Sequence, residues 1–303
     1  MNGVEAALLR TLCFFDVLFY PPTFAEWMSL VDRKGEYRFT EQELLSTARE
    51  LIALKRVTEQ AGRITLPGRE GLVSEQHARA QWMPRKIRTA RKVTKWLSRL
   101  SGVRFVALCN TTALGCARDE SDLDFFIITR SGVLWQTRAL AALPFKLSGR
   151  RPVSGKELPD AICLSFFVDD AALDLHPLMQ LPDDPYFRYW FLSLLPLYDD
   201  GVGQTLWEAN GVLRERHPYA VPWLVNPDLR IQKPILRLPG LSLLEQLARK
   251  AQERVLPPEI RASQGTEKGV IYSDHVLKFH AQDARASMRE AYETRCHEYD
   301  VEP

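Results

Sequence analysis

The hydrophobic and polar positions of residues 1–72 follow helical spacing three times and then alternate. We predict helices at residues 4–19, 24–32 and 40–54 and a hairpin over residues 56–66. Pro21 and Pro22 end the first helix, and Thr40 with Glu43 forms a capping box at the start of the third. Three helices followed by a hairpin is the element order of a winged helix, so we expect a winged-helix-like domain over residues 1–72.

A further helical pattern covers residues 73–101 and predicts one helix that connects this domain to the rest of the chain. Besides its apolar face, this helix has a basic face formed by Arg85, Arg88, Lys92, Lys95 and Arg99. No Asp or Glu occurs from Gln76 to Arg118, so the basic helix 85–99 could bind a polyanion such as a nucleic acid. Charge runs on helices are most often only solvated, and we favour that interpretation here.

Residues 102–182 change to a pattern of strands and helices. We predict strands at 103–109, 122–129 and 162–168 and a helix at 133–147. The strands are largely apolar, which is typical of a sheet covered on both faces. We therefore expect an α/β (α+β) core with a mixed sheet over residues 102–182. A helical C-terminal region is expected over residues 183–303, with late helices at 241–254 and 274–298.

Composition and charge narrow the class of protein only slightly. The chain has 303 residues, 46% of them hydrophobic and 26% charged, which is ordinary for a globular protein. Its net charge of +2 is too small to indicate a nucleic-acid or membrane partner. The five cysteines lack the paired spacing of a zinc site, so we expect reduced thiols in a cytoplasmic protein. No stretch approaches the roughly 20 apolar residues that span a bilayer, so we expect no membrane contact.

The most informative stretch runs from Val106 to Thr129 and contains two closely spaced acids. Asp122 and Asp124 stand two residues apart in a predicted strand, so their carboxylates are expected to project from the same face. Carboxylates held that close repel each other unless a cation lies between them. Oxygen ligands suit Mg²⁺ or Mn²⁺. The sequence therefore predicts a magnesium or manganese site at this pair.

The same stretch resembles the DNA polymerase β-type nucleotidyltransferase superfamily in its minimal bacterial and archaeal form. That family's signature is a strand, a Gly-Ser turn, a spacer of about ten residues and Asp-x-Asp in an apolar strand. The positions that carry the resemblance are Asn110, Thr111, Gly115, Ala117, Arg118, Ser121, Asp122 and Asp124. Asn110 stands where the family has glycine; Asn is the non-glycine residue best able to adopt the left-handed conformation.

The resemblance implies a nucleotidyltransferase core and roles for individual residues. Asp122 and Asp124 would bind metal and act in catalysis, together with a third acid for which Asp174, in the context Leu-Asp-Leu, is the candidate. The nucleotide's phosphates would be bound by Asn110, Thr111, Arg118 and Ser121. For Arg118 an ion pair with Asp119 or Glu120 is an equally good interpretation.

The implied activity is metal-dependent transfer of a nucleoside monophosphate from an NTP, such as ATP, to an acceptor hydroxyl. The acceptor could be a small molecule, a protein or an RNA end. Near the C-terminus, Lys278, His280 or Arg285 could also reach a substrate, although a solvated helix start is the default interpretation. The alternative function is a DNA-binding or toxin–antitoxin-type regulator with a degenerate, inactive transferase fold. Magnesium-dependent nucleotide binding would distinguish the two.

Overall fold

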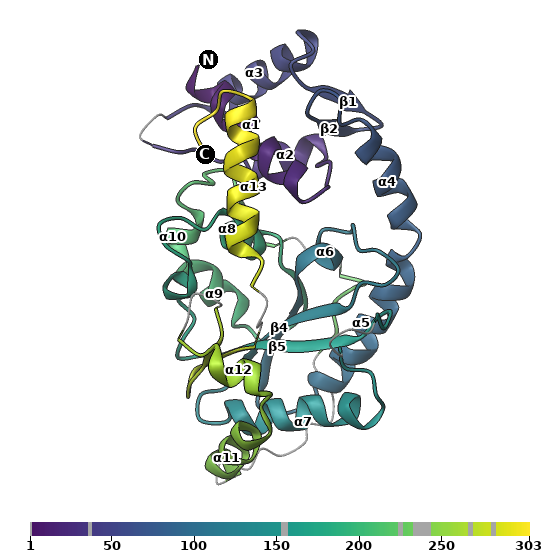
Figure 1. Cartoon of the computed structure of the whole chain (residues 1–303), viewed down its shortest axis with the longest axis vertical. Coiled ribbons are helices and arrows are strands. Elements are labelled where there is room, and N and C mark those ends of the chain that lie inside the picture. Colours follow the sequence, from purple (N-terminus) through teal and green to yellow (C-terminus); the bar gives the residue numbers. More distant parts are fainter. Residues whose placement is uncertain are drawn as a thin grey trace.

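A six-stranded mixed sheet lies at the centre of the structure, with helices around it (Figure 1). The computed structural model describes residues 2–35, 38–152, 157–223, 227–232, 244–265, 269–279 and 283–303. The strands are β3 (Val103–Leu108), β4 (Leu123–Thr129), β5 (Ile162–Asp169), β6 (Leu195–Asp199), β7 (Ile271–Tyr272) and β8 (Val276–Lys278). Their order is β6-β3-β4-β5-β8-β7, with β4 and β5 parallel and the other neighbours antiparallel. The expectation of a mixed α/β fold is confirmed.

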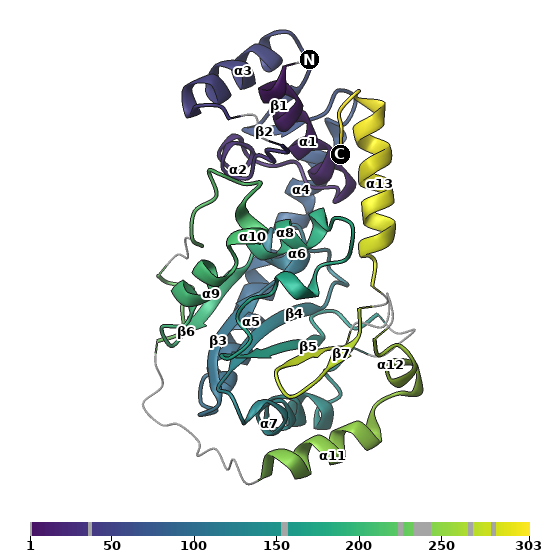
Figure 2. The same cartoon turned by 90° about the vertical axis from the view of Figure 1, so that its left-hand side faces the viewer.

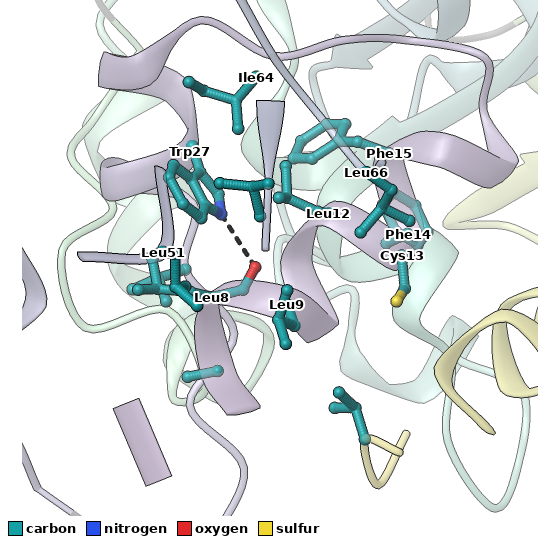
Figure 3. Close-up of a cluster of buried hydrophobic side chains, with 14 of the residues drawn as sticks. Leu8, Leu9, Leu12, Cys13, Phe14, Phe15, Trp27, Leu51, Ile64 and Leu66 are labelled. Atoms are coloured by element: carbon teal, nitrogen blue, oxygen red, sulfur yellow. Dashed lines mark hydrogen bonds between the residues drawn. The ribbon is translucent and has the colours of Figure 1, made fainter. Parts of the chain in front are cut away.

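The N-terminal unit has the predicted element order. Its elements are α1 (Gly3–Val17), α2 (Phe24–Ser29), α3 (Glu41–Ala53), β1 (Thr58–Gln60) and β2 (Arg63–Thr65). Strands β1 and β2 form an antiparallel hairpin, and Thr40 with Glu43 forms the predicted capping box. At the core of the unit the indole Nε1 of buried Trp27 donates a hydrogen bond to the carbonyl oxygen of Leu8, at 2.9 Å (Figure 3). The assignment to the winged-helix fold stays a prediction.

The connecting segment is two helices rather than the predicted single one. They are α4 (Gly71–Ala80) and α5 (Met83–Leu97), which follow one another from the N-terminal unit to the sheet (Figure 1). Pro84 lies in the first turn of α5, where its missing N–H is tolerated; inside a continuous helix it would remove a hydrogen bond. The prediction of one helix was wrong because the apolar spacing continues across this break.

Each face of the sheet is covered by its own set of helices. Helices α5 and α7 (Leu134–Leu147) pack on one face, which includes Phe125 and Ile127 of β4. The other face includes Phe126 and Ile128 and is covered by α8 (Pro185–Leu192), α9 (Gly203–Ala209) and α10 (Gly211–Arg214). The alternation along β4 is that of a strand buried on both sides, as the apolar sequence predicted.

The described part of the C-terminal region is mainly helical, as the sequence predicted, but it also contains strands that the sequence did not predict. Strands β6, β7 and β8 all come from residues 183–303 and join the central sheet, so the sheet extends beyond residues 102–182. The described helices of this region include α11 (Glu245–Val255), α12 (Pro258–Ala262) and α13 (Arg285–Glu298). Helix α11 lies beside α7, and α13 packs along α1 (Figure 2). No helix in the described part of the chain is both long and apolar enough to cross a bilayer.

Candidate functional site

The two acids of the predicted metal site come together at one end of the sheet. Asp122 directly precedes β4, and Asp124 is the second residue of that strand; both side chains are half-buried. One carboxylate oxygen of each and the Sγ atom of Cys163 all lie within 4.8 Å of one another. The neighbouring residue on β5 is therefore a cysteine, which the sequence did not indicate as part of the site.

An irregularity in β5 brings the cysteine to this position. Cys163 pairs with Asp124 and Phe166 pairs with Phe126, so β5 has one more residue than β4 between the two pairs. Phe166 and Phe126 face the same core. Such a β-bulge re-aims side chains next to it. It allows Cys163 to lie beside the carboxylates while the following residues of β5 still fill the core.

The electrostatics of this cluster favour a bound cation. Burial and the charge of Asp124 raise the pKa of Asp122 to about 7, and the charge of Lys86 opposes this rise. Burial, followed by the charges of Asp124 and Asp122, raises the pKa of Cys163 well above its usual value, so this side chain is a neutral thiol. A hard divalent cation bound to the two carboxylates would relieve their repulsion, whereas a thiol is a poor ligand for Mg²⁺.

The loop that precedes Asp122 is held by a buried lysine. Lys86 of α5 is fully buried, and its Nζ atom donates to Asp160 at 2.9 Å and to the backbone carbonyls of Asp119 and Ser121. Arg85 contacts Asp160 as well, at 2.8 Å. Arg85 therefore turns toward this loop, unlike the other members of the predicted basic face. Those four residues, Arg88, Lys92, Lys95 and Arg99, are exposed.

The two other residues predicted to bind phosphate lie in the same loop. The Ser121 hydroxyl accepts a hydrogen bond from the backbone N–H of Arg118, at 3.0 Å, which stabilises the turn before Asp122. Arg118 is exposed. Within the described residues it forms no ion pair with Asp119 or Glu120, and Asp119 pairs with Arg85 instead. The guanidinium of Arg118 is therefore accessible to a ligand.

The turn at Asn110 lies beside Asp124 because β3 and β4 are antiparallel. Asn110 has a φ of +57°, the left-handed conformation expected of a residue in the place of glycine. Its Nδ2 donates to the Asp124 carboxylate at 2.7 Å, and its Oδ1 accepts from the Tyr186 hydroxyl at 3.0 Å. Thr111 follows in α6 (Asn110–Ala113) and is exposed. Asn110 thus links Asp124 to Tyr186 on α8, a contact that glycine would not make.

A cavity of about 190 Å³ opens beside Asp124 and Asn110. Aromatic residues line part of it, among them Phe166, Tyr186, Phe187 and Trp190. Buried charges line another part of it: Lys278 pairs with Asp283 at 2.9 Å, and Arg285 pairs with Asp184 at 2.7 Å. Lys278 and Arg285, named from sequence, thus reach the cavity, already paired with carboxylates. His280 lies outside the described residues.

Asp174 does not join the two acids. Strands β4 and β5 are parallel, Asp122 and Asp124 lie at the start of β4, and Asp174 follows the end of β5. Each strand residue adds about 3.3 Å, so the length of the strands separates Asp174 from the pair. Its carboxylate accepts a hydrogen bond from the backbone N–H of His176 at 3.0 Å, just before a short 3₁₀ helix over His176–Leu178. The prediction that Asp174, from its Leu-Asp-Leu context, is the third acid beside Asp122 and Asp124 is therefore wrong.

Comparisons with protein-family models, with curated proteins and with solved structures found no match. Any functional assignment therefore rests on the site itself. Sequence reasoning missed Cys163, Lys86 and Tyr186. The role of Lys86 could not be predicted, because no acid lies near it in the sequence and its partner Asp160 comes from a distant loop. Only Cys163 carried a usable signal, as a possible ligand near the start of a largely apolar predicted strand.

Proposed function

We propose that this chain is a metal-dependent nucleotidyltransferase that moves a nucleoside monophosphate from an NTP to an acceptor hydroxyl. The observation that carries the proposal is the convergence of Asp122 and Asp124 beside the left-handed turn at Asn110. Two unconnected parts of the signature, the turn after one strand and the acids at the start of the next, meet at one end of the sheet. The aromatic cavity beside Asp124 supports binding of a nucleoside next to the acids.

The donor set fits a hard divalent cation, Mg²⁺ or Mn²⁺. Asp122 and Asp124 would hold it through oxygen, and Cys163 as a thiol would only border it. When bound, such an ion neutralises phosphate charge and lowers the pKa of an attacking hydroxyl. The resemblance implies a third acid, but Asp174 lies elsewhere. The present residues accordingly support one ion held by two carboxylates.

The residues around the acids would position the nucleotide for transfer. Thr111 and Arg118 are exposed, in the turn after β3 and in the loop before Asp122, and would contact the phosphates. Asn110 would keep Asp124 oriented through its hydrogen bond. In the reaction the acceptor oxygen forms a bond to the α-phosphorus, and the bond from that phosphorus to the bridging oxygen breaks. Pyrophosphate leaves, and the proton of the acceptor hydroxyl passes to water.

Nucleotide binding tests this function without knowledge of the acceptor. We expect a non-hydrolysable ATP analogue to bind the full chain with Mg²⁺ and to bind at least about tenfold more weakly with EDTA, by isothermal titration calorimetry. Asp122→Asn and Asp124→Asn should each remove this dependence on Mg²⁺. Asp174→Asn is the matched control, because it removes the same charge from the far end of β5 and should change nothing. The proposal would be refuted if the analogue bound equally well with Mg²⁺ and with EDTA, or if all three variants changed its binding equally.

The second candidate is a DNA-binding or toxin–antitoxin-type regulator with a degenerate, inactive transferase fold. The observation that favours it is Cys163, which occupies the position beside Asp124. This candidate requires no nucleotide binding that depends on Mg²⁺. It does require nucleic-acid binding that weakens steeply with salt, through the exposed face of α5 formed by Arg88, Lys92, Lys95 and Arg99.

A further inference from the structure

A second, larger cavity of about 540 Å³ lies against the first half of β5. Strand β8 pairs with β5 from Phe166 to Val168, and the backbone N–H of Phe279 donates to the carbonyl of Ser165 at 2.9 Å. Beyond this point, at Cys163, no strand in the described part of the chain pairs with this edge of β5. The cavity opens at this edge, between α7, α11 and α12. Part of its wall is apolar and comes from Val255, Leu256, Pro257, Ile260 and Phe279.

The charged side chains that line this cavity are all cations. They are Arg138 and Lys146 of α7 and Arg151, which follows that helix; the described lining includes no Asp or Glu. Arg138 is only 7% exposed, and its guanidinium stacks on the ring of Phe279 at 4.3 Å. Its Nε atom is buried and has no hydrogen-bond partner among the described residues. A buried guanidinium in this state favours an anionic ligand, because an unpaired charge is costly to bury.

The single hydrogen bond that Arg138 makes to a described side chain is to a neutral group. Its Nη1 donates to Gln252 Oε1 at 2.6 Å. The amide nitrogen of Gln252 donates to the carbonyls of Trp135 and Ala248, at 2.7 and 3.0 Å, so its oxygen is the atom that faces Arg138. Burial and the charge of Arg151 lower the pKa of Arg138 to about 9. Gln252 thus orients Arg138 without neutralising it, and two cations face the same space.

This cavity adjoins the acids of the candidate site. Cys163 lines the cavity, and its Sγ atom lies within 4.8 Å of carboxylate oxygens of Asp122 and Asp124. Ser165 lines both this cavity and the aromatic one beside Asp124, and its hydroxyl lies 3.1 Å from Cys163 Sγ. A ligand in the cationic cavity can therefore extend along the edge of β5 to the acids.

We propose that the cationic cavity binds the phosphate group of a small-molecule acceptor, which is thus a phosphate monoester with a free hydroxyl. The inference rests on the proposed function and specifies its acceptor. Arg138, Lys146 and Arg151 bind the phosphate, the apolar wall packs against the body of the molecule, and the hydroxyl points past Cys163 to the acids. That hydroxyl oxygen forms the bond to the α-phosphorus of the NTP, pyrophosphate leaves, and the proton passes to water.

The first test is phosphate-ester binding to the full chain in EDTA, with phenyl phosphate as the probe. Calorimetry should show binding about tenfold tighter than that of inorganic phosphate or phenol, because the cavity offers both cations and an apolar wall. The double substitution Lys146→Gln/Arg151→Gln should weaken binding about tenfold or more. The control Arg88→Gln/Lys92→Gln removes the same charge from α5 and should leave binding unchanged. Circular dichroism checks that both variants are folded.

No saturable binding of phenyl phosphate, or equal weakening in both double variants, would overturn the proposal. A second titration adds Mg²⁺ and a saturating non-hydrolysable ATP analogue. Phenyl phosphate should still bind; if the analogue displaces it, and if Lys146→Gln/Arg151→Gln weakens the analogue, the cavity holds the triphosphate and the acceptor inference is wrong. Failure of the proposed function is a different outcome, namely no Mg²⁺-dependent nucleotide binding while phenyl phosphate binds normally.

Discussion

Replacing Lys86 with methionine should destabilise the protein substantially although the substitution adds no bulk. Lys86 is fully buried and donates to Asp160 and to the carbonyls of Asp119 and Ser121. Removing one partner of a buried ion pair costs about 3–5 kcal/mol because it leaves the other charge uncompensated. Here Arg85 still contacts Asp160 at 2.8 Å, so Asp160 keeps a cation. We therefore expect a loss of about 2–4 kcal/mol in the free energy of unfolding, from the three hydrogen bonds that the charged Lys86 side chain donates. The two carbonyls keep one other donor each, because Arg85 also donates to Asp119 and the backbone N–H of Asp160 donates to Ser121.

Urea unfolding followed by tryptophan fluorescence measures this loss. With an m-value of about 3 kcal/mol per molar, the midpoint should fall by about 1 M. Lys92→Met is the matched control: it removes the same charge from the exposed face of α5 and should change the free energy of unfolding by less than about 0.5 kcal/mol. Hydrogen exchange should accelerate in residues 118–122 of Lys86→Met even under native conditions. If Lys86→Met is as stable as Lys92→Met, the buried lysine does not hold the loop and the reasoning fails.

Three further changes test other parts of the structure. Burial lowers the pKa of His217 from 6.5 to about 4, so the unfolded chain binds more protons between these values. The contribution of neutral His217 to the free energy of unfolding is fully present above about pH 6.5 and falls by about 3 kcal/mol as the pH drops to 4. In urea titrations the free energy of unfolding of His217→Gln should depend less on pH in this range. Trp27→Phe should lose about 2 kcal/mol with its hydrogen bond to Leu8, and an unchanged unfolding midpoint would contradict this. Asn110→Ala should be about 1 kcal/mol less stable than Asn110→Gly, because only glycine adopts the positive φ without strain; equal midpoints would exclude this.

The sequence predicted elements best where the signal was local. The helices and hairpin of the N-terminal unit and strands β3, β4 and β5 follow from spacing, caps and turns within a few residues. Strand β6 did not, because Leu195–Asp199 continues the apolar run of α8 and becomes a strand only by pairing with β3. Strand β8 likewise depends on pairing with β5, which lies over 100 residues away along the chain, and β7 in turn pairs with β8.

In the candidate site, too, the features that depend on local sequence were predictable and those that depend on strand pairing were not. The i, i+2 spacing of Asp122 and Asp124 and the left-handed turn at Asn110 are local properties, and the structure places them together. The third position depends on the pairing of β4 with β5 and on the bulge in β5, neither of which leaves a pattern in the sequence. We predicted Asp174 for this position from the residues next to it in the sequence. Cys163 occupies the position because it pairs with Asp124 in the sheet.

Helix α8 contacts both the candidate site and the N-terminal unit, so these two parts of the chain do not fold as independent domains. Its Tyr186 donates to Asn110 at the acids, and Tyr189, three residues later, stacks on Phe14 of α1 with ring centroids 4.0 Å apart. Tyr189 and Tyr292 of α13 complete the core of the N-terminal unit. Removing residues 1–72 would expose these rings on the remaining fragment. The chain should accordingly melt in a single calorimetric transition, and the N-terminal unit could not be exchanged between proteins as an independent module.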